Sequence, residues 1–548
     1  MRDVRIGNGD AVKRLVLAAF LACAPSFAVA GDASRLNSST QPHVFRYADA
    51  EEPAGLNPVL VQQGSVNRLG QLAMAWLFRY GPDSKPAPEL ATVVPSKKNG
   101  GISPDGKTIT YHLRTGVKWS DGRPFNADDV VFSFNAMNNP SNIITSREGF
   151  ELIEKIDEPN AATVVVHLRR PYASFIPIFF TTAGGQPCLL PKHILGSLPN
   201  INTAPYNNLP IGIGPFRFTA WHRGEAVDLE ANPNYWRGRP KLDRIVYKLI
   251  PDRNTVLTQL QTGELDFWYP FGGAYLSRVE SIKTVDVVRK PGYLYNHLDF
   301  NLSKPVLQEK AVRQALRLAS DRTAIRDKVL HGVGFLQESV VPAAYPGAAK
   351  LSFVKFDIAQ ANALLDRAGW KRASDGVREK NGLRLQLEFV SSTGTPDADT
   401  QIELIRATWQ QIGVGLDVKR APSSLLFAPA TDGGIVNGGK FDVIIFAWGV
   451  SPTDDLYNTF SCDSIPPKGQ NDLHYCNRAL EPILADFQTR YNPAQQTADL
   501  NRAAHIIADD VPTIVLVSRE DLYAANKDLK NFHPNNVTYF DDMMNVDI

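Results

Sequence analysis

Residues 209–267 read LPIGIGPFRFTAWHRGEAVDLEANPNYWRGRPKLDRIVYKLIPDRNTVLTQLQTGELDF, and this stretch decides the fold. Apolar and polar side chains alternate over residues 216–221 and again over 227–231, which predicts two strands that each bury one face. Residues 244–250 are apolar enough to predict a strand buried on both faces. Residues 252–263 predict a helix that an aspartate caps and a glycine ends. The stretch therefore predicts sheet strands followed by a helix.

Three strings follow one another within this stretch: GxGPFxF, NPxYWRGxPKLDRIV and IPDxxxxLxxLxxGELD. Together they resemble the signature block of the family 5 extracellular solute-binding proteins, the peptide and nickel binders that serve ABC importers. Residues 103–135 and 312–325 resemble two further blocks of the same family, and they read SPDGKTITYHLRTGVKWSDGRPFNADDVVFSFN and VRQALRLASDRTAI. The resemblance covers essentially the whole chain after its first thirty residues.

The resemblance implies an α/β fold, that of a two-lobed periplasmic binding protein of type II (cluster C) with an extra domain on the first lobe. About 518 residues follow the first thirty, which is more than one hydrophobic core usually serves. We place the first lobe in residues 31–76, 209–292 and 518–548, the extra domain in 77–208 and the second lobe in 293–517. Alternating strands and helices in the second lobe predict a mostly parallel, doubly wound sheet.

Residues 1–30 predict a secretory signal peptide. Basic side chains precede an apolar run over residues 15–24, and an A-x-A cleavage site follows at 28–30. Cys23 leaves a lipid-anchored alternative open, although the residues before it form a poor lipobox. No other segment approaches the ~20 apolar residues that a spanning helix needs. We therefore expect a soluble, exported protein that begins at Gly31 and lies in the periplasm.

The charge balance gives no sign of a polyanionic partner. Removal of the signal peptide takes away four basic and two acidic residues and leaves 54 basic and 55 acidic side chains. A formal net charge of −1 follows from those counts. Such a balance favours neither nucleic acid nor an anionic lipid surface as a partner.

Three cysteines remain after residue 30, namely Cys188, Cys462 and Cys476. In an oxidising compartment the second and third are the preferred disulfide pair. That bond would close a loop of about fifteen residues and stabilise the fold by roughly 3 kcal/mol on the chain-entropy model. Cys188 would then be a buried free thiol. The alternative is that all three are reduced and merely packed.

Residues 441–449 predict a buried strand that ends in a loop, and ligands of open α/β sheets lie beyond the strand ends. The family resemblance implies a Trp-x-x-Asp here in peptide binders, whose carboxylate pairs with the ligand amine. This chain has Trp448 and Ser451 at those places, with Asp454 three positions further on. An uncharged serine cannot neutralise a buried ammonium group. Trp448 can stack on a flat or apolar ligand face, or it can be a core residue.

Two more positions complete the predicted ligand site. Dipeptide binders of the family resemble one another in an arginine that meets the ligand carboxylate, and this chain has Ser392 there. Ser65 follows a loop that resembles the family's turn toward the cleft, and it would lie near bound ligand unless that loop is simply solvated. Both ion-pairing anchors of a dipeptide site are therefore absent from the sequence.

The predicted function is capture of a peptide or peptide-like solute by a monomer that delivers it to an ABC permease, without cofactor or catalysis. Three ligand classes stay open: a longer peptide, a modified peptide or amino-acid conjugate, and a sugar-like or other polar solute. A metal complex, a signalling or chaperone role and a secreted hydrolase are the remaining alternatives. The hydrolase finds no support in the motifs, since G-x-S-x-G, H-E-x-x-H, Walker and EF-hand patterns are absent and the histidines lack metal-ligand spacing.

Overall fold

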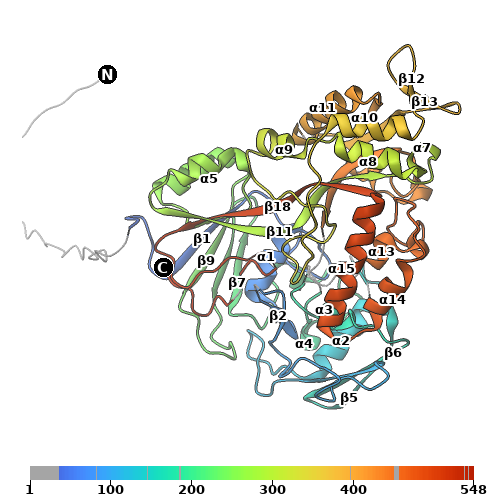
Figure 1. Cartoon of the computed structure of the whole chain (residues 1–548). Coiled ribbons are helices and arrows are strands. Elements are labelled where there is room, and N and C mark those ends of the chain that lie inside the picture. The colour runs from blue at the N-terminus through green and yellow to red at the C-terminus, as the bar shows by residue number, and fades with distance from the viewer. Residues whose placement is uncertain are drawn as a thin grey trace, which may run out of the picture.

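One mixed sheet of ten strands runs through the computed structural model (Figure 1). The structure describes residues 36–548 except 82, 145, 148, 184–186, 395, 450–455, 536 and 541, so the signal peptide and Cys23 stay predictions. In spatial order the strands are β16 (Gly415–Ala421), β15 (Gln386–Ser392), β17 (Val443–Gly449), β11 (Val285–Phe300), β18 (Thr513–Asn526), β10 (Phe267–Trp268), β1 (Val44–Asp49), β9 (Arg244–Leu249), β8 (Ala226–Ala231) and β7 (Phe216–His222).

The two long strands β11 and β18 are antiparallel and belong to both lobes. The first part of β11 pairs with the end of β18 beside β10, and its last part pairs with β17. The prediction of a mostly parallel second lobe is therefore only partly right. Strands β15, β16 and β17 are parallel, but β11 and β18 join them in the opposite direction.

The three strands predicted in the deciding stretch are present as β7, β8 and β9. The prediction that the third is buried on both faces is wrong, because its residues alternate between buried and more accessible positions. One face of β9 packs into the core through Ile245, Tyr247 and Leu249. The other face carries charged and polar side chains such as Lys248, which hydrogen-bonds Gln259 on the neighbouring helix.

Helices and small sheets cover the large sheet on both sides (Figure 1). One lobe packs against α1 (Gly64–Ala73), α2 (Ala127–Asn138), α5 (Arg253–Thr262) and α6 (Leu276–Glu280), and against the sheet β4 (Thr108–His112), β6 (Thr163–Leu168), β5 (Ile153–Asn160). The other packs against α8 (Lys310–Leu318), α10 (Ile358–Arg367) and α11 (Pro396–Gln411) on one face and α14 (Glu481–Thr489) and α15 (Pro493–Asp510) on the other.

Shorter elements fill the connections. They are α3 (Phe175–Ile178), α4 (Lys192–Leu195), α7 (Pro305–Gln308), α9 (Arg322–Ala324), α12 (Ser423–Leu426), α13 (Tyr457–Phe460), β2 (Phe78–Tyr80), β3 (Pro86–Pro88), β12 (Lys371–Arg372), β13 (Arg378–Lys380) and β14 (Leu383–Arg384). No helix in the described part of the chain is long and apolar enough to cross a membrane.

The predicted helix caps and cysteine states are confirmed. The Asp252 side chain accepts a hydrogen bond from the backbone of Thr255, and α5 ends at Gly263, whose φ of 77° suits glycine. Cys462 and Cys476 form a disulfide bond. Cys188 is a buried free thiol, and burial raises its pKa to about 12.

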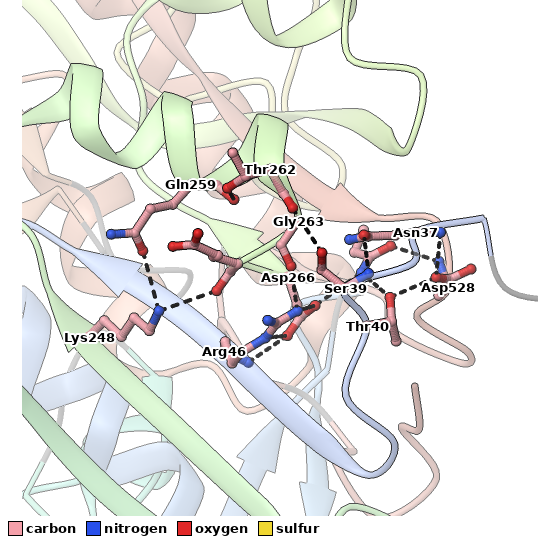
Figure 2. Close-up of polar contacts among 12 residues, drawn as sticks. Asn37, Ser39, Thr40, Arg46, Lys248, Gln259, Thr262, Gly263, Asp266 and Asp528 are labelled. Atoms are coloured by element: carbon pink, nitrogen blue, oxygen red, sulfur yellow. Dashed lines mark hydrogen bonds and ion pairs between the residues drawn. The ribbon is translucent and has the colours of Figure 1, made fainter. Parts of the chain in front are cut away.

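A buried ion pair fixes β1 to the turn after α5 (Figure 2). Asp266 accepts hydrogen bonds from Nε and Nη2 of Arg46, both at 2.8 Å, and from the backbone of Arg46 at 2.9 Å. The side chain of Asn526, at the end of β18, donates a further bond of 3.0 Å to the same carboxylate. Three segments distant in sequence therefore meet at one carboxylate.

We expect the substitution Asp266→Ala to lower the free energy of unfolding by about 3–5 kcal/mol, because it leaves the buried Arg46 guanidinium without its counter-ion. Urea unfolding followed by circular dichroism measures the change. Asp252→Ala is the control, since it removes an exposed helix cap and should cost about 1 kcal/mol. Equal losses for the two variants would contradict the importance of the buried pair.

Candidate functional site

The candidate site lies where the two lobes meet. Strands β11 and β18 pass through this place, and their pairing register shifts between Pro291 and Tyr295 and again between Asn296 and His297. Such bulges bend and twist a strand pair locally. The backbone is also close-packed here, because a Cβ on Gly292 would lie 2.9 Å from Oδ2 of Asp521.

An apolar cluster links residues from both sides of this junction. Tyr80, Ala183, Tyr293 and Val537 form the cluster, and Tyr345 packs against it. The Tyr293 hydroxyl donates to the carbonyl oxygen of Ala344 at 3.0 Å and also hydrogen-bonds Ser84. The lobes are thus in contact close to the strand crossing.

We call the residues on the β1 side of the junction the first wall. They begin with an ion pair at the end of β1. Asp49 accepts a hydrogen bond of 3.0 Å from Nε of Arg68, and it also accepts from the hydroxyl of Tyr247. Ser65, one turn earlier on α1, is fully buried, and its backbone donates to Glu51 at 3.1 Å. The Ser65 hydroxyl has no hydrogen-bond partner among the described residues.

Tyrosine rings and a second ion pair continue this wall. The Tyr269 ring stacks on Tyr523 with 4.5 Å between centroids, and its hydroxyl donates to Oδ1 of Asp521 at 3.3 Å. The same oxygen lies 2.9 Å from Nε of Arg519. The Arg68 guanidinium lies 5.7 Å from the ring of Tyr539, within cation–π range. Burial raises the pKa of Asp521, and the guanidinium of Arg519 opposes that rise.

The residues on the β17 side of the junction form the second wall, which includes two of the predicted site residues. Because β15 and β17 are parallel neighbours, Ser392 and Trp448 both lie at their carboxyl ends. Trp448 is half-buried, pairs with Tyr295 on β11, and makes an edge contact with Phe446 at 5.9 Å between centroids.

The structure thus places Ser392 and Trp448 at the same edge of the sheet and Ser65, buried, on the other lobe. Ser451 and Asp454 lie outside the described residues. The role of all five in ligand binding stays a prediction. Among the residues of the two walls, Arg519 and Trp448 keep accessible surface, so a guanidinium and an aromatic ring are available to a polar solute at the junction. Within the described ranges, no group of three or more His, Cys, Asp or Glu side chains is placed to hold a metal ion.

Sequence reasoning missed the charged residues of the first wall. The signal in the sequence is the polar run Ser518-Arg519-Glu520-Asp521, which interrupts the otherwise apolar strand β18. Buried charges in a strand need partners and are therefore often functional or structural anchors.

Known proteins resemble the chain along most of its length. The family described as bacterial extracellular solute-binding proteins, family 5 Middle, matches residues 85–466. Oligopeptide-binding protein AppA of Bacillus subtilis is 27% identical over 450 residues, which cover 80% of each chain. The dipeptide-binding protein of Escherichia coli is 26% identical over 534 residues, which cover 90% of this chain and 93% of the relative.

The solved structure of HbpA2 from Haemophilus parasuis superimposes with a TM-score of 0.80 at 23% identity, covering 92% of this chain and 99% of that one. This likeness and the large mixed sheet of this chain confirm the predicted fold, a two-lobed α/β binding protein of type II. The family match spans well over half of the sequence. The chain belongs to the bacterial extracellular solute-binding proteins of family 5.

Proposed function

We propose that this protein captures a peptide or peptide-like solute between its lobes and delivers it to the permease of an ABC importer, as a periplasmic monomer without cofactor or catalysis. Family membership and the oligopeptide- and dipeptide-binding relatives support the proposal. The structural observation that carries it is the pair β11 and β18, which joins two separately packed lobes through one sheet. We also propose the lobe boundaries near residues 292 and 518, which fall inside these two strands.

Closure of the lobes is the only motion this function requires. A solute that touches both walls gains contacts in the closed form that the open form lacks, so it shifts the equilibrium by that difference in affinity. A ligand with micromolar affinity has about 8 kcal/mol of binding free energy in total. Any contact between the lobes themselves adds to the stability of the closed form.

Such a contact exists far from the strand crossing, at the turn between α14 and α15. The Tyr491 hydroxyl donates to the carbonyl oxygen of Gly106 at 2.7 Å and accepts from the backbone of Tyr172 at 3.2 Å. The carbonyl oxygen of Gln488 accepts from the backbone of Ala173 at 2.6 Å. These bonds join a helical turn of one lobe to the region of the three-stranded sheet.

The first test of the proposal compares peptide lengths. We expect di-alanine to change the melting temperature little, because serines (Ser392 and Ser451) stand where the family resemblance implies the two charged anchors of a dipeptide site, whereas peptides of four to nine residues should stabilise through backbone contacts. Free ligand at 100 times Kd stabilises a protein by about 2.7 kcal/mol, which a thermal-shift assay detects.

A sugar panel and a panel of nickel complexes run in parallel as controls for the non-peptide alternatives. Stabilisation by one of those panels, together with none by peptides of any length, would contradict the proposal. Strong stabilisation by unmodified dipeptides would leave peptide capture intact and contradict the length argument.

The substitution Tyr491→Phe tests the role of closure. It removes two hydrogen bonds that join the lobes, each worth about 0.5–1.5 kcal/mol, so peptide affinity measured by calorimetry should fall about 5- to 150-fold. Tyr275→Phe is the matched control, since that partly buried ring packs within one lobe. An unchanged affinity for Tyr491→Phe would show that these bonds do not favour the bound form.

A further inference from the structure

Arg519 differs from the other ion-paired arginine at the strand crossing, Arg289. Both side chains keep 40% of their surface accessible, and each pairs with a carboxylate on β18. Arg289 binds its carboxylate through two nitrogens, because Nε and Nη2 donate to the two oxygens of Glu520 at 2.9 and 2.6 Å. Arg519 engages Asp521 through Nε alone, and its two Nη groups have no hydrogen-bond partner within the described part of the chain.

The surroundings of the two arginines also differ. For Arg289 the hydrogen bond with Glu520 is the leading cause of a raised pKa. For Arg519 burial is the strongest single influence and opposes the charged form, although Asp521 and the nearby tyrosines together outweigh it and the pKa is raised. Aromatic rings surround the carboxylate that Arg519 contacts, because Tyr269 donates to the same oxygen of Asp521 and stacks on Tyr523. Arg519 is therefore an accessible cation beside a cluster of tyrosine side chains.

This tyrosine cluster lies at the boundary between the lobes. Tyr269, whose hydroxyl donates to the carboxylate that pairs with Arg519, packs against Tyr539 with 5.3 Å between ring centroids. Tyr539 comes from the C-terminal segment, and two residues earlier in that segment Val537 packs with Tyr293 in the cluster that joins the lobes. Arg519 therefore lies beside the place where a captured solute would contact both walls.

The charges around Arg519 favour an anion over an ammonium group. Asp49 already accepts bonds from Arg68 and Tyr247, and Asp521 already accepts from Arg519 and Tyr269. The carboxylates are thus engaged, while the two Nη groups of Arg519 still have donors available. A carboxylate fits these two donors, because guanidinium and carboxylate can form two parallel hydrogen bonds.

We propose that Arg519 binds the terminal carboxylate of the captured peptide-like solute from the hinge strand β18. This inference rests on the proposed function. Arg519 supplies a cation from the side of the site opposite Ser392. Ser392 is the position at which the family resemblance implies an arginine. Arg519 is thereby a specificity-determining residue for solutes with a free carboxyl terminus.

The test compares alanine peptides of three to six residues as free acids and as C-terminal amides, by isothermal titration calorimetry. Wild-type protein should prefer the free acids. Arg519→Gln should weaken binding of the acids roughly 10- to 100-fold and leave the amides nearly unchanged, since charge-assisted hydrogen bonds are lost only for the acids. Arg289→Gln, the matched control on the opposite face, should keep the wild-type preference.

A double variant guards against misfolding. Arg519→Gln leaves Asp521 without its partner, so Arg519→Gln combined with Asp521→Asn gives an uncharged pair and should show the same loss of acid preference. An equal loss for acids and amides, or an acid preference that survives in both variants, would overturn the inference while leaving peptide capture intact. Binding of no alanine peptide by wild-type protein would contradict the proposed function itself, and the inference with it.

Discussion

The antiparallel pairing of β11 with β18 is the constraint on which the rest of this structure depends. A single strand pair carries the hydrogen-bond ladder from one lobe to the other, and separate hydrophobic clusters pack on either side of it. The ladder keeps the lobes in one sheet, while the register shifts after Pro291 and at Asn296 interrupt it at the crossing. A sheet that is continuous but locally bent can flex there without losing either core.

The same pairing explains why polar residues interrupt an apolar strand. On β18, Glu520 faces Arg289 across the ladder, while Arg519 and Asp521 pair with each other on the opposite face. Both faces of the strand therefore carry charge at the crossing, where neither lobe supplies a complete apolar cover. The two carboxylates are buried but paired, and their arginine partners keep 40% of their side-chain surface accessible, so a solute between the lobes would meet the guanidinium groups.

Local signals made much of the fold predictable. Asp252 and Thr255 are three residues apart, so the cap of α5 is readable from sequence, and the spacing of Cys462 and Cys476 indicated their disulfide bond. The lobe boundary proposed at residue 292 lies inside β11, which continues through Pro291 because the pairing shift there does not require the missing proline N–H. Arg519 escaped notice since its surroundings come from segments more than two hundred residues apart, which no local pattern reveals.

The distribution of buried ion pairs separates rigid parts from the part that adapts. Each lobe contains a buried arginine with several partners: Arg46 with Asp266 in one, and Arg322 with Glu338 and three backbone carbonyls in the other. Removing either partner of such a pair leaves an uncompensated charge, so these pairs hold each lobe in one arrangement. Arg519 at the crossing has a single bond from its guanidinium to a carboxylate. A partly satisfied cation between two rigid bodies is stabilised further by an anion that arrives there, so binding and closure favour each other.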